Sequence, residues 1–228
     1  MITSRHPLRN PAWESLNGAH SPLGRVRGEA ARYDEDVAPF AAVPDDASTS
    51  CWADLAALAG PGTQLVLVDP PGGTPSDWTA LWRVEGFQLT GDDLADEPDA
   101  DAVVLGPADV PAMLDLVERT RPGPFRPRTV ELGRYLGIRI DGELVAMAGE
   151  RMRPTGWTEI SAVCTDERYR GRGFAGRLVR AVGHGIRERG DLPFLHAAGQ
   201  NTNAIRLYES LGFAVNRPCV FTGWQLPA

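Results

Sequence analysis

Hydrophobic and polar positions follow a regular order over the C-terminal half of the chain, from about residue 102 to residue 228. Apolar runs with a two-residue period alternate there with stretches of helical period, which predicts a mixed α/β unit. Strands are expected at residues 102–105, 132–140, 144–152, 158–165, 192–198 and 220–225. Helices are expected from Pro107 to beyond Val117 and at residues 175–189 and 203–211.

The first hundred residues give a weaker pattern. Residues 1–50 are rich in Pro, Gly, Asn and Ser, which favours turns and edge strands over long helices. A helix at 52–59 and strands at 64–69 and 82–89 follow. The segment 91–101 (GDDLADEPDAD) then holds six acidic residues in eleven, which should repel one another and stay solvated. We therefore expect a boundary here between an N-terminal region, residues 1–98, and a domain at residues 102–228.

Composition narrows the function classes. With 43% hydrophobic and 23% charged residues the chain should fold, while a net charge of −7 argues against nucleic acid as a partner. The sequence has no Lys, which excludes a Schiff-base or P-loop lysine. Cys51, Cys164 and Cys219 are too few for a disulfide framework or a zinc site, so no metal is expected. The sequence contains neither a long apolar stretch nor a leader pattern, so we expect a cytoplasmic protein without membrane contact.

A glycine-rich turn, RGRGFAG at residues 170–176, lies between an expected strand and an expected helix. Backbone N–H groups at such a helix start can bind an anion. The spacing of Gly171, Gly173 and Gly176 also satisfies the dinucleotide pattern G-x-G-x-x-G, but the next strand does not end in an acidic residue. Glycines that serve only a tight turn are a further alternative. The surrounding arginines either suit a phosphorylated ligand or pair with nearby acids: Arg168, Arg170, Arg172, Arg177 and Arg180.

Residues 165–175 (TDERYRGRGFA) resemble the signature of the GNAT superfamily of acyl-CoA N-acyltransferases, whose R-x-x-G-x-A core is matched by Arg170, Gly173 and Ala175. Residues 201–213 (NTNAIRLYESLGF) resemble the second signature of that family. The resemblance is closest to the glycine N-acyltransferase-like branch. It implies an α/β (α+β) fold, in which helices flank a mixed, mostly antiparallel sheet. A degenerate copy of the same unit is one interpretation of the smaller N-terminal α/β region.

The resemblance implies that acetyl-CoA is the co-substrate and that coenzyme A binds where strand 158–165 splays from strand 192–198. The pantetheine arm and pyrophosphate would be held by the following residues: Val163, Cys164, Thr165, Arg170, Gly171, Arg172, Gly173, Phe174, Ala175, Gly176, Asn201 and Ala204.

The implied reaction is direct attack of an amine on the thioester. Tyr208 matches the family's tyrosine that faces the sulfur and would be the acid, although its position also suits a core aromatic. Glu159 is the favoured base and Glu150 the alternative. Strand period places Glu159 with Ser161 and Val163 on one face, unless a bulge reverses it. His184 and His196 are expected to be structural.

The acceptor is expected to be a small-molecule primary amine. Arg126 and Arg128, in the Pro-rich linker at residues 121–128, suggest that it carries a carboxylate. A non-catalytic acyl-CoA-binding or regulatory module is the alternative function, and a scaffold that binds a protein partner through the N-terminal region is a third. The sequence does not indicate an oligomeric state.

Overall fold

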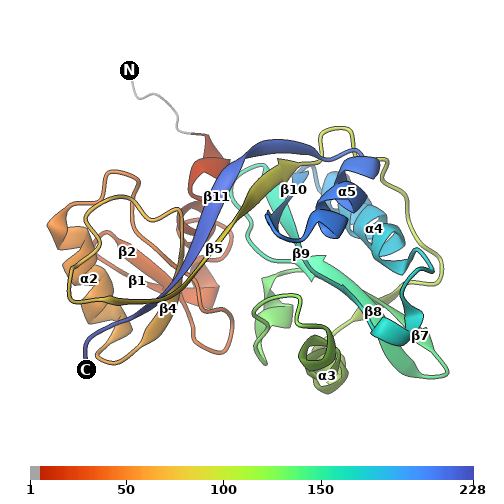
Figure 1. The fold of residues 1–228 in the computed structure, drawn as a ribbon, viewed down its shortest axis with the longest axis horizontal. Coiled ribbons are helices and arrows are strands. Elements are labelled where there is room, and N and C mark those ends of the chain that lie inside the picture. Colours follow the sequence, from red (N-terminus) through yellow and green to blue (C-terminus); the bar gives the residue numbers. More distant parts are fainter. Residues whose placement is uncertain (1–5) are drawn as a thin grey trace.

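The structure, a computed structural model, describes residues 6–228. Residues 1–5 of the expected N-terminal region lie outside the described residues. The other residues form an eight-stranded sheet, a three-stranded sheet and the helices around them (Figure 1).

The large sheet has the strand order β4-β11-β5-β10-β9-β8-β7-β6. Every neighbouring pair in it is antiparallel except β9 and β10, which are parallel. The expected fold class, a mostly antiparallel mixed sheet flanked by helices, is therefore confirmed. The strands are β4 (Gln64–Val68), β5 (Thr79–Thr90), β6 (Val103–Leu105), β7 (Tyr135–Ile140), β8 (Glu143–Glu150), β9 (Trp157–Thr165), β10 (Leu192–Ala198) and β11 (Ala214–Gln225).

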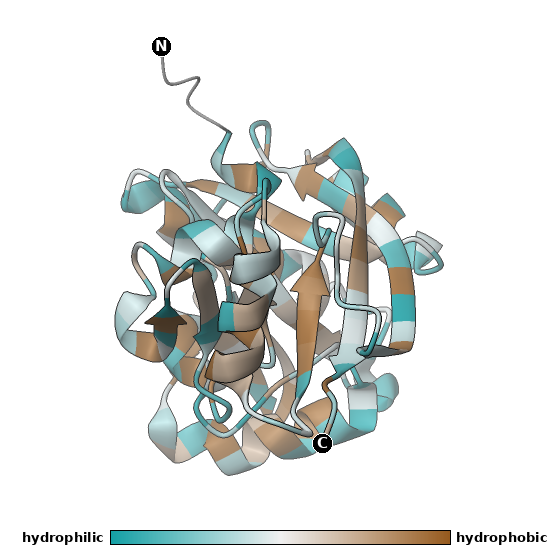
Figure 2. Cartoon of the chain, turned by 90° about the vertical axis from the view of Figure 1, so that its left-hand side faces the viewer, coloured by the Kyte–Doolittle hydropathy of each residue, from teal (hydrophilic) through white to brown (hydrophobic). Residues whose placement is uncertain are grey.

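Helices cover both faces of this sheet at its C-terminal end. Helix α4 (Phe174–Glu188) packs its apolar side on one face, while α3 (Val110–Thr120) packs on the other face in a separate core (Figure 1). Helix α5 (Thr202–Ser210) lies beside α4. Apolar residues concentrate on the strands and polar ones on the surrounding loops (Figure 2). Within residues 6–228, no helix is both long and apolar enough to cross a membrane.

The N-terminal region builds a second, smaller layer and also enters the large sheet. Its own elements are α1 (Pro11–Leu16), β1 (Gly24–Arg27), β2 (Ala30–Tyr33), β3 (Ala41–Ala42) and α2 (Thr49–Ala59). Strand β5 follows these elements in the chain but pairs with both β10 and β11. In Figure 1, β5 and β11 run together from the part that holds α4 to the part that holds α2. The large sheet is thus continuous across the expected boundary at residues 91–101.

The acidic segment 91–101 keeps most of its residues exposed, as expected, but it is anchored to α4 and is not a loose linker. Leu94 is only 2% exposed, and a Cβ added to Gly183 would come within 2.2 Å of its Cδ2 atom. Arg177 donates two hydrogen bonds to Asp99, of 2.6 and 2.7 Å. Similar ion pairs join Arg187 and His184 of α4 to Asp96 and Arg180 to Glu97. The acids do not repel the segment into solvent because cations from one helix face neutralise them.

His20 joins the N-terminal region to the C-terminal half. Its Nε2–H donates to the carbonyl oxygen of Leu132 at 3.0 Å, and the Tyr33 hydroxyl donates to its Nδ1 at 2.9 Å. The ring is 4% exposed, and this burial lowers the pKa of His20 to about 4. Because the folded protein keeps His20 neutral in a range where the unfolded chain protonates it, acid should weaken this link.

We expect the free energy of unfolding to fall as the pH drops from about 6.5 to 4, by up to about 1.4 kcal/mol per pH unit from His20 alone. His20→Gln can still accept and donate a hydrogen bond but does not titrate. Urea unfolding of both proteins at pH 7 and pH 5 should therefore show a smaller loss for the variant. Equal losses would mean that His20 is already protonated in the folded protein.

We expect Leu94→Ala to lower the free energy of unfolding by about 2–5 kcal/mol, because it empties a space against α4. The matched control is Asp92→Ala, an exposed side chain in the same segment, which should change stability by less than about 0.5 kcal/mol. Denaturant unfolding measures both. A Leu94→Ala variant as stable as the control would restore the interpretation of a loose linker.

Candidate active site

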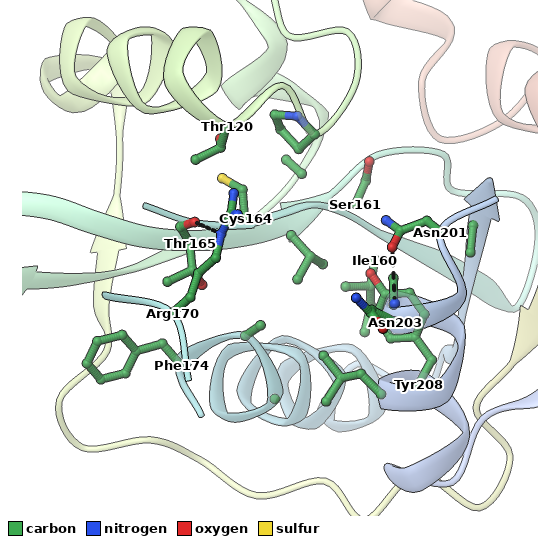
Figure 3. Close-up of a pocket in the computed structure, with 18 of the residues that line it drawn as sticks. Thr120, Ile160, Ser161, Cys164, Thr165, Arg170, Phe174, Asn201, Asn203 and Tyr208 are labelled. Carbon is green, nitrogen blue, oxygen red and sulfur yellow. Dashed lines mark hydrogen bonds between the residues drawn. The ribbon is translucent and has the colours of Figure 1, made fainter. Parts of the chain in front are cut away.

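A cleft opens where β9 and β10 separate. The two strands are paired from Trp157 and Leu192 as far as Ile160 and Leu195, and no partner register continues beyond. Their diverging ends, the glycine-rich turn, α5 and the end of α3 enclose a volume of about 840 Å³ (Figure 3). The structure thus has the splayed strands that the family resemblance implies.

A β-bulge shapes the wall of this cleft on β9. Gly149 of β8 faces Ser161, but Met147 faces Cys164, so the register shifts between these pairs. Ala162, inside the shift, has a positive φ of 53°. The bulge leaves Ala162 and its neighbour outside the regular ladder, and their backbone polar groups lie at the cleft wall. It also interrupts the two-residue period, so residues before and after it cannot be placed on one face by parity alone.

The glycine-rich turn forms an open cradle at the start of α4. Gly171 and Gly173 have φ values of 78° and 77°, a conformation that favours glycine, and a Cβ on either would meet nothing within 4 Å. Gly173 caps α4, so the N–H groups of the next three residues have no acceptor within the helix. The turn therefore presents backbone donors and a helix N-terminus to open space, which suits a phosphate group.

The arginines near the turn fall into two groups. Arg168 binds Asp166 and Glu143, and two others bind the acidic segment described above, so these three are structural. Arg170 and Arg172 line the cleft and have no carboxylate partner within residues 6–228. The Arg170 Nε donates to the Thr165 carbonyl oxygen at 3.4 Å, and the Arg172 guanidinium lies over the Tyr169 ring, 5.1 Å from its centre.

All twelve residues that the sequence assigns to the co-substrate line this one cleft. Two of them, Thr165 and Asn201, differ in the hydrogen bonds of their side chains. The Thr165 Oγ1 is buried and has no hydrogen bond among the described residues. Asn201 caps α5 through its Oδ1, which accepts the Ala204 N–H at 3.2 Å (Figure 3). Burial raises the pKa of the Cys164 thiol to about 11, so this cysteine is uncharged at neutral pH.

Tyr208 extends from α5 into the same cleft (Figure 3). Its side chain is 8% exposed, and its ring contacts Phe213 edge to face with centroids 6.1 Å apart. Burial raises the pKa of Tyr208 to about 12. The phenol is therefore protonated at neutral pH and is able to donate its proton.

Neither of the expected bases lines the cleft. Glu159 is fully buried, with Arg151 bound to it through Nε at 2.8 Å and Nη2 at 2.5 Å. Burial alone would raise the pKa of Glu159, but Arg151 and His196 hold it well below its ordinary value. Glu150 is also buried and accepts a hydrogen bond from Arg189 at 2.6 Å. No Asp or Glu is among the described residues that line the cleft.

His196 lines the cleft, and its ring is fixed by two hydrogen-bond contacts. Its Nδ1–H donates to Glu159 at 2.6 Å, and its Nε2 lies 3.2 Å from the Gln88 Nε2. The Gln88 nitrogen also donates to the Leu8 carbonyl oxygen, which identifies it as a donor toward His196. Both ring nitrogens are thereby engaged. His184 binds Asp96 on α4, outside the cleft.

Sequence reasoning missed two arginines that line the cleft, Arg121 and Arg151, and chose two that do not. Arg128 is bound to Glu131 by two hydrogen bonds of 2.8 Å, and neither it nor Arg126 reaches the cleft. Arg121 is the C-cap residue of α3 and has a left-handed φ of 48°. Arg151 directly follows β8, and its backbone N–H donates to the Glu159 carbonyl oxygen across the β8–β9 hairpin. The register of this hairpin, which places the two residues opposite each other, is the signal that could have pointed to Arg151.

Comparisons with known proteins identify the family of the chain. A family model described as FR47-like protein matches residues 135–222. A crystal structure of a GNAT-family protein from Novosphingobium aromaticivorans is 40% identical, with a TM-score of 0.89 over 98% of this chain and 100% of the other. No functionally curated protein matches the chain.

More distant structures share the fold alone. A GCN5-related N-acetyltransferase from Kribbella flavida is 19% identical, with a TM-score of 0.60 over 95% of this chain and 96% of the other. A GCN5-related N-acetyltransferase-like protein from Streptococcus suis is 18% identical, with a TM-score of 0.56 over 98% and 94%. These matches do not distinguish the glycine N-acyltransferase-like branch. The identity and coverage of the Novosphingobium protein do assign the family, and the chain belongs to the GNAT family of acetyltransferases.

Proposed function

We propose that the protein is an N-acetyltransferase that moves an acetyl group from acetyl-CoA to a primary amine. The observation that carries this proposal is the open glycine cradle at the start of α4. It is flanked by Arg170 and Arg172, which have no carboxylate partner in the part of the chain that the structure describes. In a protein of net charge −7, cations kept free at one turn indicate an anionic ligand there.

The residues present fit coenzyme A. Gly171 and Gly173 leave space for a phosphate close to the backbone, and Arg170 and Arg172 supply charge beside it. The diverging ends of β9 and β10 expose backbone groups that a pantetheine amide can bind as a further strand would. The buried Thr165 Oγ1, which has no hydrogen-bond partner in the described part of the chain, is a further group to which such an arm can bind.

Acetyl-CoA supplies the acetyl thioester. The acceptor nitrogen forms a bond to the acetyl carbon while the C–S bond breaks, and the nitrogen loses one proton. Tyr208 donates its proton to the departing sulfur and regains one from solvent. The products are the N-acetylated amine and free coenzyme A. Cys164 also lies in the cleft, but its uncharged thiol is a poor nucleophile, which favours direct transfer over an acetyl-cysteine.

The acceptor amine gives its proton to water rather than to a carboxylate of the cleft. This follows from the burial of Glu159 and Glu150 in ion pairs and from the absence of acids among the described lining residues. In this proposal water therefore takes the role of base that was expected of Glu159 or Glu150. An acceptor that reaches the cleft already neutral is attacked most readily, so its own pKa should govern the rate.

A non-catalytic acyl-CoA-binding module is the alternative. It would use the same cradle but would not need a protonated Tyr208 in the cleft. Turnover decides between the two functions: release of free thiol from acetyl-CoA in a screen of amines supports the enzyme, and binding without release supports the module. The glycine N-acyltransferase-like branch stays a prediction.

We expect Gly173→Glu to weaken acetyl-CoA binding about 100-fold or more, because the side chain brings negative charge into the cradle. Calorimetric titration of the folded proteins measures this. The matched control is Gly156→Glu: Gly156 has a similar φ of 76° and open surroundings but lies outside the cleft. Equal weakening in both variants would indicate backbone strain, and no binding to the natural protein would overturn the proposal.

We expect Tyr208→Phe to lower kcat by about 10²–10⁴-fold while the Kd for acetyl-CoA stays nearly constant, because the lost hydroxyl acts on the leaving sulfur. Tyr169→Phe is the control, since Tyr169 lines the same cleft but lies under Arg172. Steady-state kinetics with any amine that is turned over would show the contrast. Similar rates for Tyr208→Phe and the natural protein would remove Tyr208 from the chemistry.

A further inference from the structure

The cleft has a second basic region apart from the glycine-rich turn. Arg151 lines it next to Ile160 and Ser161, where β9 is about to leave β10. Figure 3 shows Ser161 and Thr120 on the opposite side of the cleft from Phe174, which begins α4. The cradle at α4 suits the phosphates, so this other side is where an acceptor can approach the thioester.

Two nitrogens of Arg151 are fixed by an ion pair, and the third is available to a ligand in the cleft. Two of its nitrogens, Nε and Nη2, bind Glu159, and its guanidinium lies 5.0 Å from the ring centre of Phe40 and 5.9 Å from that of Phe221. Its side chain is 12% exposed. The third nitrogen, Nη1, makes no hydrogen bond within residues 6–228. A desolvated guanidinium with a free edge is a strong donor for an anion.

A chain of hydrogen bonds fixes this orientation. Glu159 also accepts from His196, which is bound to Gln88, and the Gln88 Oε1 accepts from Asn216 of β11 at 2.8 Å. Glu159 is therefore a positioning residue for Arg151 rather than a group that contacts the acceptor. Because Phe40 belongs to the N-terminal region and Phe221 to β11, elements from both ends of the chain position the same guanidinium.

The charges on this side of the cleft favour an anionic ligand, since Arg151 is largely buried and the exposed Arg121 also lines the cleft. Arg121 and Arg151 both line it, whereas the ionised acid that binds either of them within the described residues is Glu159 alone. Two guanidinium groups against one carboxylate leave one positive charge, which a single carboxylate of a ligand would neutralise.

We propose that Arg151, oriented by Glu159 and assisted by Arg121, binds a carboxylate on the acceptor, so that the substrate is a small primary amine that carries a carboxylate, such as an amino acid. This inference rests on the proposed acetyl transfer. The carboxylate anchors the acceptor at Arg151 and leaves its amine to react at the thioester. The product is an N-acetylated carboxylic acid, released together with free coenzyme A.

The test compares amino acids with their primary amides on the natural protein, at pH values that leave the same fraction of each amine unprotonated. The amide removes the negative charge and changes little else. We expect kcat/KM to be at least about tenfold higher for acids than for amides, mainly through KM. Equal or higher values for the amides would overturn the inference. Absence of product from every amine would overturn the proposed function, and the inference with it.

Two variants assign the effect to these residues. Arg151→Lys keeps a positive charge beside Glu159 but loses the planar fork, and it should reduce the preference for acids over amides about tenfold or more. Arg121→Asn keeps a residue that tolerates a left-handed φ, removes the second cation and should reduce the same preference. Arg126→Lys, outside the cleft, is the control and should leave the preference as it is. A loss of preference in the control alone would assign the carboxylate to the linker instead.

Discussion

Two parallel strands that stop pairing halfway along must satisfy their backbone polar groups in some other way, and this constraint governs the architecture of the protein. Strands β9 and β10 separate beyond Ile160 and Leu195, and the bulge at Ala162 removes further backbone from the ladder. An unpaired edge inside a protein is costly unless water or a ligand reaches it. The cleft supplies that access, and α4, α5 and the end of α3 surround it because their apolar sides pack on the strands beside it.

Much of this could be predicted from the sequence because the relevant signals are local. The two-residue period located β10 and most of β9, and a Gly-rich turn before a helical period located the cradle at α4. The charge count of segment 91–101 predicted a loose linker because it did not include the basic side chains of α4 that pair with the acids. Those partners, Arg177, Arg180, His184 and Arg187, recur at three- and four-residue spacing on one face of α4. That spacing is visible in the sequence, but its pairing with acids 78 to 91 residues earlier depends on the tertiary fold.

The base at Glu159 shows a second limit of sequence reasoning. Alternation along β9 can place a carboxylate on a face, but it cannot tell whether the carboxylate is open to substrate or already paired. Burial against Arg151 and His196 decides that question, and both partners come from other strands or their ends. The ion pair aligns the Arg151 guanidinium, and in our proposal Glu159 therefore supports binding and does not transfer a proton. The N-terminal region takes part in the same arrangement, because its Phe40 ring contacts the Arg151 guanidinium.

The arginines that fasten the acidic segment to α4 have a chemical consequence as well as a structural one. Every basic residue of the chain other than histidine is an arginine. A guanidinium stays protonated at physiological pH and is a poor nucleophile, whereas the amine of a lysine side chain can react with a thioester. A protein that holds an activated acetyl group in an open cleft would slowly modify its own surface lysines and weaken the ion pairs they form. This chain has no lysine, so the arginines in its ion pairs should not react with the acetyl-CoA that we propose it binds.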